Sequence, residues 1–289
     1  MTGKTSFTLT ILGLAALGWL LTYPVQTQAQ TEGNDAVYNA SNGVTFSSSF
    51  IDASQFLGHN QGVDLCDTIY GILVNKWGVA AYPSSGAVVD ARGISSALTC
   101  TLGSPWTEGS NTATLPSTIL LPAGTIQIST PWVLPSNTRL IGEGESDPRS
   151  AVPGTTIQAA SQIQLQAMIQ FGSSAVCSSG CSGISVERLT IDGNSLFLHG
   201  ISNLYAQNNT YVDHVTLYQI LGTGLLISGP SAQNSGPYTN VTFDTGSTPV
   251  TTSTACAQII GTGGTKGIRG LMCKSETNDA PAAVLSGSA

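Results

Sequence analysis

Residues 186–192 read "VERLTID", and the same pattern returns twice further along the chain. Thr216 in "YVDHVTLY" follows Thr190 by 26 residues, and Thr242 in "PYTNVTFD" follows after another 26. A fixed interval of this length is typical of a coil that stacks each strand on its equivalent in the next coil. We therefore predict an all-β fold, a right-handed parallel β-helix (solenoid). The apolar residues fall into two columns: Leu189, Val215 and Val241, and Ile191, Leu217 and Phe243.

The rest of the chain agrees with this fold class. Most apolar segments are four to seven residues long and end at Gly, Pro, Asn or Ser, as in "GAVVDARG" and "TILLPAGTIQI". Such segments are typical of short strands. One stretch, 64–77, has helical spacing instead, with Asp64 as N-cap and Gly78 as stop signal. We expect this helix to cap the first coil. Its apolar residues are Leu65, Ile69, Ile72, Leu73 and Trp77.

The composition excludes several classes of protein. The chain has 289 residues, of which 41% are hydrophobic and 9% are charged, and its net charge is −7. The apolar content argues against disorder. The negative charge and the absence of a basic cluster argue against a nucleic-acid partner, because phosphates need clustered Lys and Arg.

The N-terminus indicates export. Lys4 precedes the apolar run "FTLTILGLAALGWLLTY", and Thr27 and Ala29 stand at the small-residue positions of a cleavage site. Residues 1–29 are therefore predicted to be a signal peptide, with an uncleaved membrane anchor as the alternative. The mature protein is expected to be secreted, periplasmic or at the cell surface, without a further membrane segment. The expected segments are 30–61, an extended arm or linker; 62–275, the β-helix domain; and 276–289, a flexible tail.

Six cysteines all follow the predicted signal peptide, and an even number in an exported chain indicates disulfides. Six cysteines permit fifteen pairings, and the sequence alone does not choose among them. Spacing favours Cys177 with Cys181 and Cys256 with Cys273, which leaves Cys66 with Cys100. A zinc site is the weaker interpretation, because no His stands near a cysteine pair at zinc spacing.

The segment from "DLCDTIYGILVNKW" through "TTIQA" resembles exported pectate-lyase-like β-helix proteins, the group with rhamnogalacturonase- and epimerase-type domains. The likeness rests on the helix, on the strand Pro122 to Ile126 and on the "L-x-G-x-G" pattern from Leu140 to Gly144. It covers roughly 62–245. It implies a solenoid that binds glycans on an outward polar ladder, and its members include lyases, hydrolases, epimerases and adhesins.

Alternation along the repeated strand predicts the functional side chains. Asp192 and Asp244 are two coils apart, roughly 9.6 Å at a coil spacing of about 4.8 Å. Inverting glycosidases separate their two carboxyl groups by about 6.5–9.5 Å, so this pair is the candidate catalytic pair. The alternative is that both are turn residues, in "DGN" and "DTG". The candidate substrate-binding residues are Arg188, His214, Tyr218 and Asn240.

Other motifs do not support a specific activity. "LHGIS" around His199 resembles the His-Gly motif of polygalacturonases, but that family's "NTD", Asp-Asp and "R-x-K" segments are missing, so the activity is not inferred. No cofactor is expected, and the acids near Arg188 are too few to support a calcium site. Two hypotheses remain open for this expected monomer: a lyase or glycosidase acting on an acidic polysaccharide, or a non-catalytic glycan-binding or adhesin β-helix.

Overall fold

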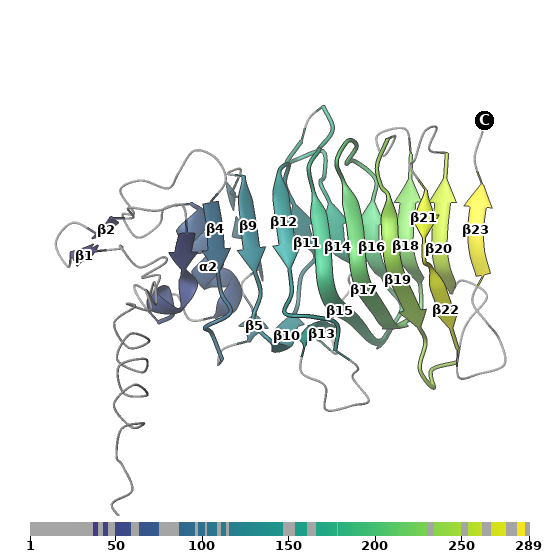
Figure 1. The fold of residues 1–289 in the computed structure, drawn as a ribbon, viewed down its shortest axis with the longest axis horizontal. Coiled ribbons are helices and arrows are strands. Elements are labelled where there is room, and N and C mark those ends of the chain that lie inside the picture. Colours follow the sequence, from purple (N-terminus) through teal and green to yellow (C-terminus); the bar gives the residue numbers. More distant parts are fainter. Residues whose placement is uncertain are drawn as a thin grey trace, which may run out of the picture.

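The structure is a computed structural model, and its strands stack side by side along one long axis (Figure 1). The predicted signal peptide at 1–29 lies outside the described residues. In the part of the chain that the structure describes, no helix is long and apolar enough to cross a membrane. The described residues are 37–39, 43–45, 50–58, 64–74, 87–95, 98–101, 103–108, 111–113, 116–146, 154–160, 166–177, 179–229, 234–249, 254–261, 267–275 and 282–286.

The larger sheet has twelve strands, all paired in parallel. Its main path runs in the order β3 (Phe50–Asp52), β4 (Ala87–Asp90), β9 (Ser117–Leu120), β12 (Thr138–Ile141), β15 (Ser185–Leu196), β17 (Tyr211–Ile220), β19 (Tyr238–Asp244) and β21 (Ile268–Arg269). The other four strands are β5 (Thr99–Cys100), β10 (Gly124–Ile128), β13 (Thr155–Ala159) and β22 (Met272–Lys274).

The second parallel sheet has six strands, and two small antiparallel sheets lie near the N-terminal end. The six are β11 (Trp132–Leu134), β14 (Ala167–Phe171), β16 (His199–Asn203), β18 (Thr223–Ser228), β20 (Ala255–Ile260) and β23 (Ala282–Ser286). The antiparallel strands are β1 (Val37–Asn39), β2 (Gly43–Thr45), β6 (Gly103–Ser104), β7 (Thr107–Glu108) and β8 (Asn111–Thr112).

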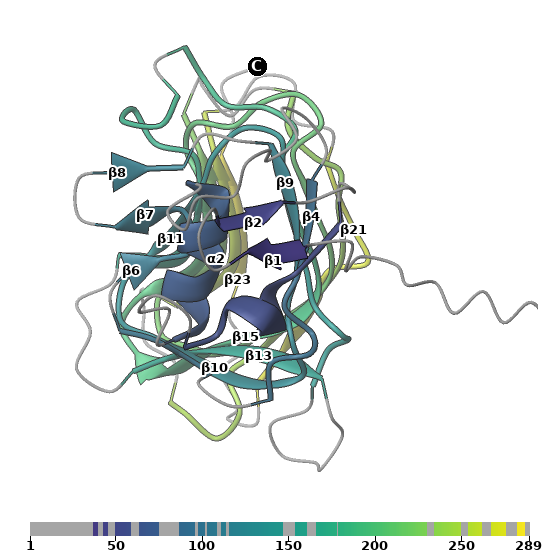
Figure 2. The same ribbon diagram turned by 90° about the vertical axis from the view of Figure 1, so that its left-hand side faces the viewer.

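The long strands of the larger sheet bend from one face of the solenoid to another. The first part of β15 pairs with β12, at Ser185 to Glu187, and its second part pairs with β13, at Thr190 to Asp192. The end-on view shows the result: β4 and β9 lie on one side, β10, β13 and β15 on a second, and β11 and β23 on a third (Figure 2).

The 26-residue register is confirmed. Thr190 pairs with Thr216, and Thr216 with Thr242, while both apolar columns are 0% exposed and line the core. Burial of this continuous stripe of Leu, Ile, Val and Phe is the main stabilising contribution, at about 25 cal/mol per Å². The fold is therefore a parallel β-solenoid, as the sequence predicts.

One α-helix, α2 (Leu65–Leu73), lies against the N-terminal end of the stack (Figures 1 and 2). The Asp64 carboxylate is its N-cap: Oδ1 accepts the N–H of Asp67 at 2.8 Å, and Oδ2 accepts the N–H of Thr101 at 2.9 Å. All nine helical residues are buried, which fits a capping role. The helix ends at Leu73, with Val74 as C-cap, whereas the sequence predicts it to 77; residues 75–86 lie outside the described part.

The three disulfides favoured by spacing are present: Cys66–Cys100, Cys177–Cys181 and Cys256–Cys273. The first ties α2 to β5 at one end of the solenoid, and the last ties β20 to β22 at the other. Disulfides in this number are typical of proteins that fold in oxidising compartments.

Two of the expected segments contain strands that pair with the solenoid sheets. The arm predicted for 30–61 contains β3, which pairs with β4 and extends the larger sheet by one strand. The tail predicted to be flexible at 276–289 contains β23, which pairs with β20. In both cases a short apolar segment satisfies the free backbone groups of a sheet edge.

Candidate functional site

The bends in β15, β17 and β19 occur at one column of residues with left-handed backbone. Arg188, His214 and Asn240 have φ of 56°, 52° and 52°, and Gly270 continues the column with φ of 66°. This conformation breaks the alternation of the strand, so that two consecutive residues face outward at each bend. In β17 these two residues are Asp213 and His214.

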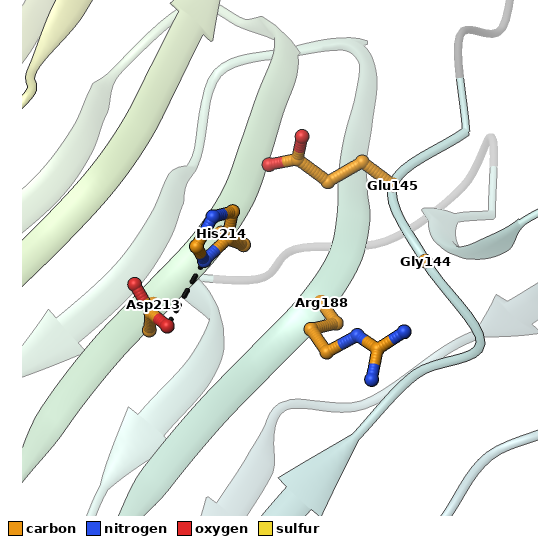
Figure 3. A pocket seen from close by; sticks show the side chains of 5 residues that line it. All are labelled: Gly144, Glu145, Arg188, Asp213 and His214. Atoms are coloured by element: carbon orange, nitrogen blue, oxygen red, sulfur yellow. Dashed lines mark ion pairs between the residues drawn. The ribbon is translucent and has the colours of Figure 1, made fainter.

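A pocket of about 320 Å³ opens beside this column, within the size range of small-ligand sites. His214 lies between the carboxyl groups of Asp213 and Glu145, while the Arg188 side chain extends sideways from its strand, with the guanidinium group pointing away from His214 (Figure 3). The lining residues are Gly144, Glu145, Arg188, Asp213 and His214.

Glu145 comes from the loop 142–146, which follows β12 and crosses over the bend. The Gly144 N–H donates to the Arg188 carbonyl at 3.0 Å, and the Gly144 carbonyl accepts the Thr155 N–H at 3.0 Å. Gly144 has φ of 135°, a conformation that favours glycine. A side chain at Gly142 would meet the Arg188 carbonyl at 2.4 Å, so the close crossing also depends on glycine. The "L-x-G-x-G" pattern therefore has a physical role: it brings Glu145 to the pocket.

Partial burial of its carboxyl group raises the pKa of Glu145, and the negative charge of Asp213 adds to the rise. Electrostatic interactions with His214 and Lys274 and a hydrogen bond from Thr216 act in the opposite direction, but the pKa stays above the ordinary value for glutamate. Glu145 as a whole residue is exposed, so water screens its interactions with these groups. A carboxyl group of this kind is suited to donate a proton.

The pKa of Asp213 moves the other way. Burial raises it, but hydrogen bonds from Thr239, His214 and Asn240 outweigh burial and lower the pKa. The Thr239 Oγ1 donates to Oδ1 at 2.5 Å, and His214 Nδ1 lies 2.9 Å from Oδ2. A carboxylate in this position favours the tautomer of His214 that carries its proton on Nδ1, so that Nε2 is the acceptor nitrogen of the ring. The Asn240 Nδ2 amide lies 3.4 Å from this Nε2.

The structure brings together three of the four expected binding residues. Arg188 and His214 line the pocket, and Asn240 donates from Nδ2 to the Asp213 carboxylate at 3.2 Å. Tyr218 is 7% exposed and is not part of the pocket lining, because it lies beyond the bend, beside Asp192 and Asp244.

Asp192 and Asp244 do not line the pocket either. Asp192 is 4% exposed and accepts the Asn194 N–H and the Gln158 Nε2 amide, each at 2.8 Å. Asp244 is 5% exposed and accepts the Gly246 N–H at 2.8 Å. These are contacts of turn residues. The catalytic role expected for the pair stays a prediction.

The remaining candidates lie elsewhere. His199 is in β16, its Nδ1 accepts the Thr223 N–H at 2.9 Å, and burial lowers its pKa, so it has a structural contact in the second sheet. Among the described residues, no group of three or more His, Cys, Asp and Glu side chains is placed to hold a metal ion.

Glu145 and Asp213 were not identified from the sequence. A signal for Asp213 exists: Val212 and Val215 are both buried but stand three residues apart, as do Val186 and Leu189, so one extra residue interrupts the alternation. Glu145 carries no such local signal, because its position depends on where the loop crosses.

Comparisons of the chain with models of known protein families, with curated proteins and with solved structures found no significant match.

Proposed function

We propose that this protein is a secreted, polysaccharide-active β-helix protein that carries out acid–base chemistry on a glycan bound across β15 and β17. The observation that carries the proposal is the pair of carboxyl groups at one pocket with pKa values shifted in opposite directions, upward for Glu145 and downward for Asp213. Titratable groups with pKa values shifted in opposite directions are typical of active sites. The raised pKa suits Glu145 to act as the acid, and the lowered pKa keeps Asp213 ionised, so that it can orient His214 as the base.

The residues then divide the work. Glu145, protonated, donates a proton to the glycosidic oxygen as the bond breaks. His214, oriented by Asp213, accepts a proton at Nε2, either from a water that attacks the sugar or from a sugar carbon next to a carboxylate. The first reaction is hydrolysis and the second is elimination.

Charge on the neighbouring coils favours an acidic polysaccharide. Arg92 and Arg139 are paired with acids. Arg188, Arg269 and Lys274 have no ion pair within the described residues, and all three belong to the coils of β15, β21 and β22. In a chain of net charge −7, they provide positions for the carboxylates of a uronate-containing glycan.

Membership of the pectate-lyase-like family is part of the same proposal. The parallel coils, the helix α2 at the first coil and the glycine-containing loop after β12 support it. The predicted signal peptide and the three disulfides support secretion.

A glycan-binding module without turnover is the second candidate. One observation favours it: both oxygens of Asp213 already accept hydrogen bonds, from Thr239 and Asn240 on Oδ1 and from His214 on Oδ2, which is the pattern of a side chain that holds a surface in place.

The test is an assay of reducing ends and of absorbance from unsaturated products, on a panel of acidic and neutral polysaccharides, with binding measured alongside. Glu145→Gln is expected to lower turnover by about 10²- to 10⁴-fold and to keep binding. Glu143→Gln is the matched control, because Glu143 is in the same loop but contacts Arg92 rather than the pocket. Binding without turnover in the wild type would favour the module. Neither binding nor turnover on any glycan would refute the proposal.

A further inference from the structure

Thr190 is buried beneath the loop that carries Glu145. It is 0% exposed and lies in the second half of β15, past the bend. Its single hydroxyl makes two hydrogen bonds to one loop residue: Oγ1 accepts the Ser146 N–H at 3.0 Å and donates to the Ser146 carbonyl at 2.8 Å. The Thr190 hydroxyl therefore satisfies the backbone N–H and carbonyl of Ser146, which in a sheet would pair with the backbone of a neighbouring strand.

The other side of Glu145 is held as well. Gly144 is bonded through both its N–H and its carbonyl, to Arg188 and Thr155. Glu145 thus stands between two residues whose backbone groups are fixed. Its own side chain is left to extend over the pocket toward His214 (Figure 3).

We propose that Thr190 is a positioning residue for Glu145, holding the loop 142–146 so that the carboxyl group stays over the pocket beside His214. This inference rests on the proposed role of Glu145 as proton donor. Thr190 acts only through the loop and is not among the residues that line the pocket.

The column that contains Thr190 supplies a matched control. Thr242 occupies the equivalent position two coils further on in the same register, but it is only partly buried, and no part of the described chain crosses it with a hydrogen bond to its hydroxyl. Thr190→Val removes both hydrogen bonds to Ser146 at nearly constant volume, Thr190→Ser keeps the hydroxyl, and Thr242→Val tests the loss of a threonine hydroxyl elsewhere in the column.

The first readout is the titration of the Glu145 carboxyl group, followed by carbon NMR on protein labelled in glutamate, with the resonance assigned from Glu145→Gln. The groups that face Glu145 are His214, Asp213, Thr216 and Lys274, and none of them is changed in these variants. In Thr190→Val the midpoint is expected to fall toward that of ordinary glutamate, because a released loop exposes the carboxyl group to water. Thr190→Ser and Thr242→Val should keep the wild-type midpoint.

The second readout is turnover of a polysaccharide identified with the wild type, expected to fall about 10²-fold in Thr190→Val and to return in Thr190→Ser. If Thr190→Val does not fold, Thr190→Cys takes its place, since a thiol is a weak donor and acceptor. An unchanged Glu145 midpoint in the folded variant overturns the positioning role. Absence of glycan turnover in the wild type overturns the proposed function instead, because the titration needs no substrate.

Discussion

The Nδ1 atom of His214 lies 2.9 Å from Oδ2 of Asp213, although the two residues are consecutive in one β-strand. In a regular strand, consecutive side chains point to opposite faces, so such a pair would be separated by the sheet itself. The left-handed backbone of His214, with φ of 52°, removes that obstacle. A bend that the solenoid needs at its corner therefore also assembles half of the candidate site.

The hydrogen bonds to Asp213 predict a pH-dependent contribution to stability. Because the pKa of Asp213 is lowered in the folded state, its contribution is present above the unfolded pKa of about 3.9 and is lost as the pH falls through the lowered folded value. We expect Asp213→Asn to cost at most about 1 kcal/mol at neutral pH, since the side chain is 35% exposed. Urea unfolding from pH 7 to pH 2 measures this.

The difference between wild type and Asp213→Asn should shrink as the solution is acidified below about pH 4. Thr239→Val, which removes the 2.5 Å hydrogen bond to Asp213, should lose part of the same pH-dependent term. A difference that stays constant over the whole pH range would contradict this account of Asp213.

Arg188 lines the pocket and has a left-handed backbone conformation that is unfavourable for arginine. We therefore expect that replacing it increases stability but weakens binding. In the same column the next coil carries His214, and the two coils after it carry Asn240 and Gly270, the residue types that best tolerate left-handed backbone. Arg188→Asn is therefore expected to raise the free energy of unfolding by about 0.5–1 kcal/mol and to weaken binding of acidic polysaccharides. Thermal unfolding and a binding assay on the same preparation measure the two effects.

Arg269→Asn serves as the control, because Arg269 is also an exposed arginine on these coils but does not have left-handed backbone. Its stability should stay within about 0.5 kcal/mol of the wild type. Equal stabilisation of both variants would mean that loss of an arginine, rather than relief of strain at Arg188, is the cause.

The sequence predicts the solenoid and its register because both depend on residues that repeat at a fixed interval, such as Thr190, Thr216 and Thr242. The disulfides follow from spacing for a similar reason, since partners in one coil are close in the chain. Strict alternation along the strand does not predict the position of Asp213, because the left-handed backbone of His214 shifts which residues face outward. The position of Glu145 depends on contacts between its loop and a strand much later in the sequence: Ser146 donates a hydrogen bond to Thr190, 44 residues further along. No local sequence pattern predicts a contact between residues so far apart in the chain.

Asp192 and Asp244 provide the last prediction, because the spacing argument favours catalysis and their contacts are those of turn residues. Each is nearly buried and accepts a backbone N–H two residues ahead, so Asp192→Ala and Asp244→Ala are each expected to cost about 1–3 kcal/mol of stability. Asp192→Ala should cost more, since it also removes the acceptor of the Gln158 amide, which donates to Oδ2 at 2.8 Å. Denaturant unfolding of both variants, with Asn substitutions at the same positions for the glycan assays, separates the two roles. Glu145→Gln is measured alongside the two Asn variants. If either Asn variant stays folded and binds glycan yet loses turnover by 10²-fold or more, the carboxylates two coils apart are the catalytic pair, and the pocket at His214 is a binding subsite.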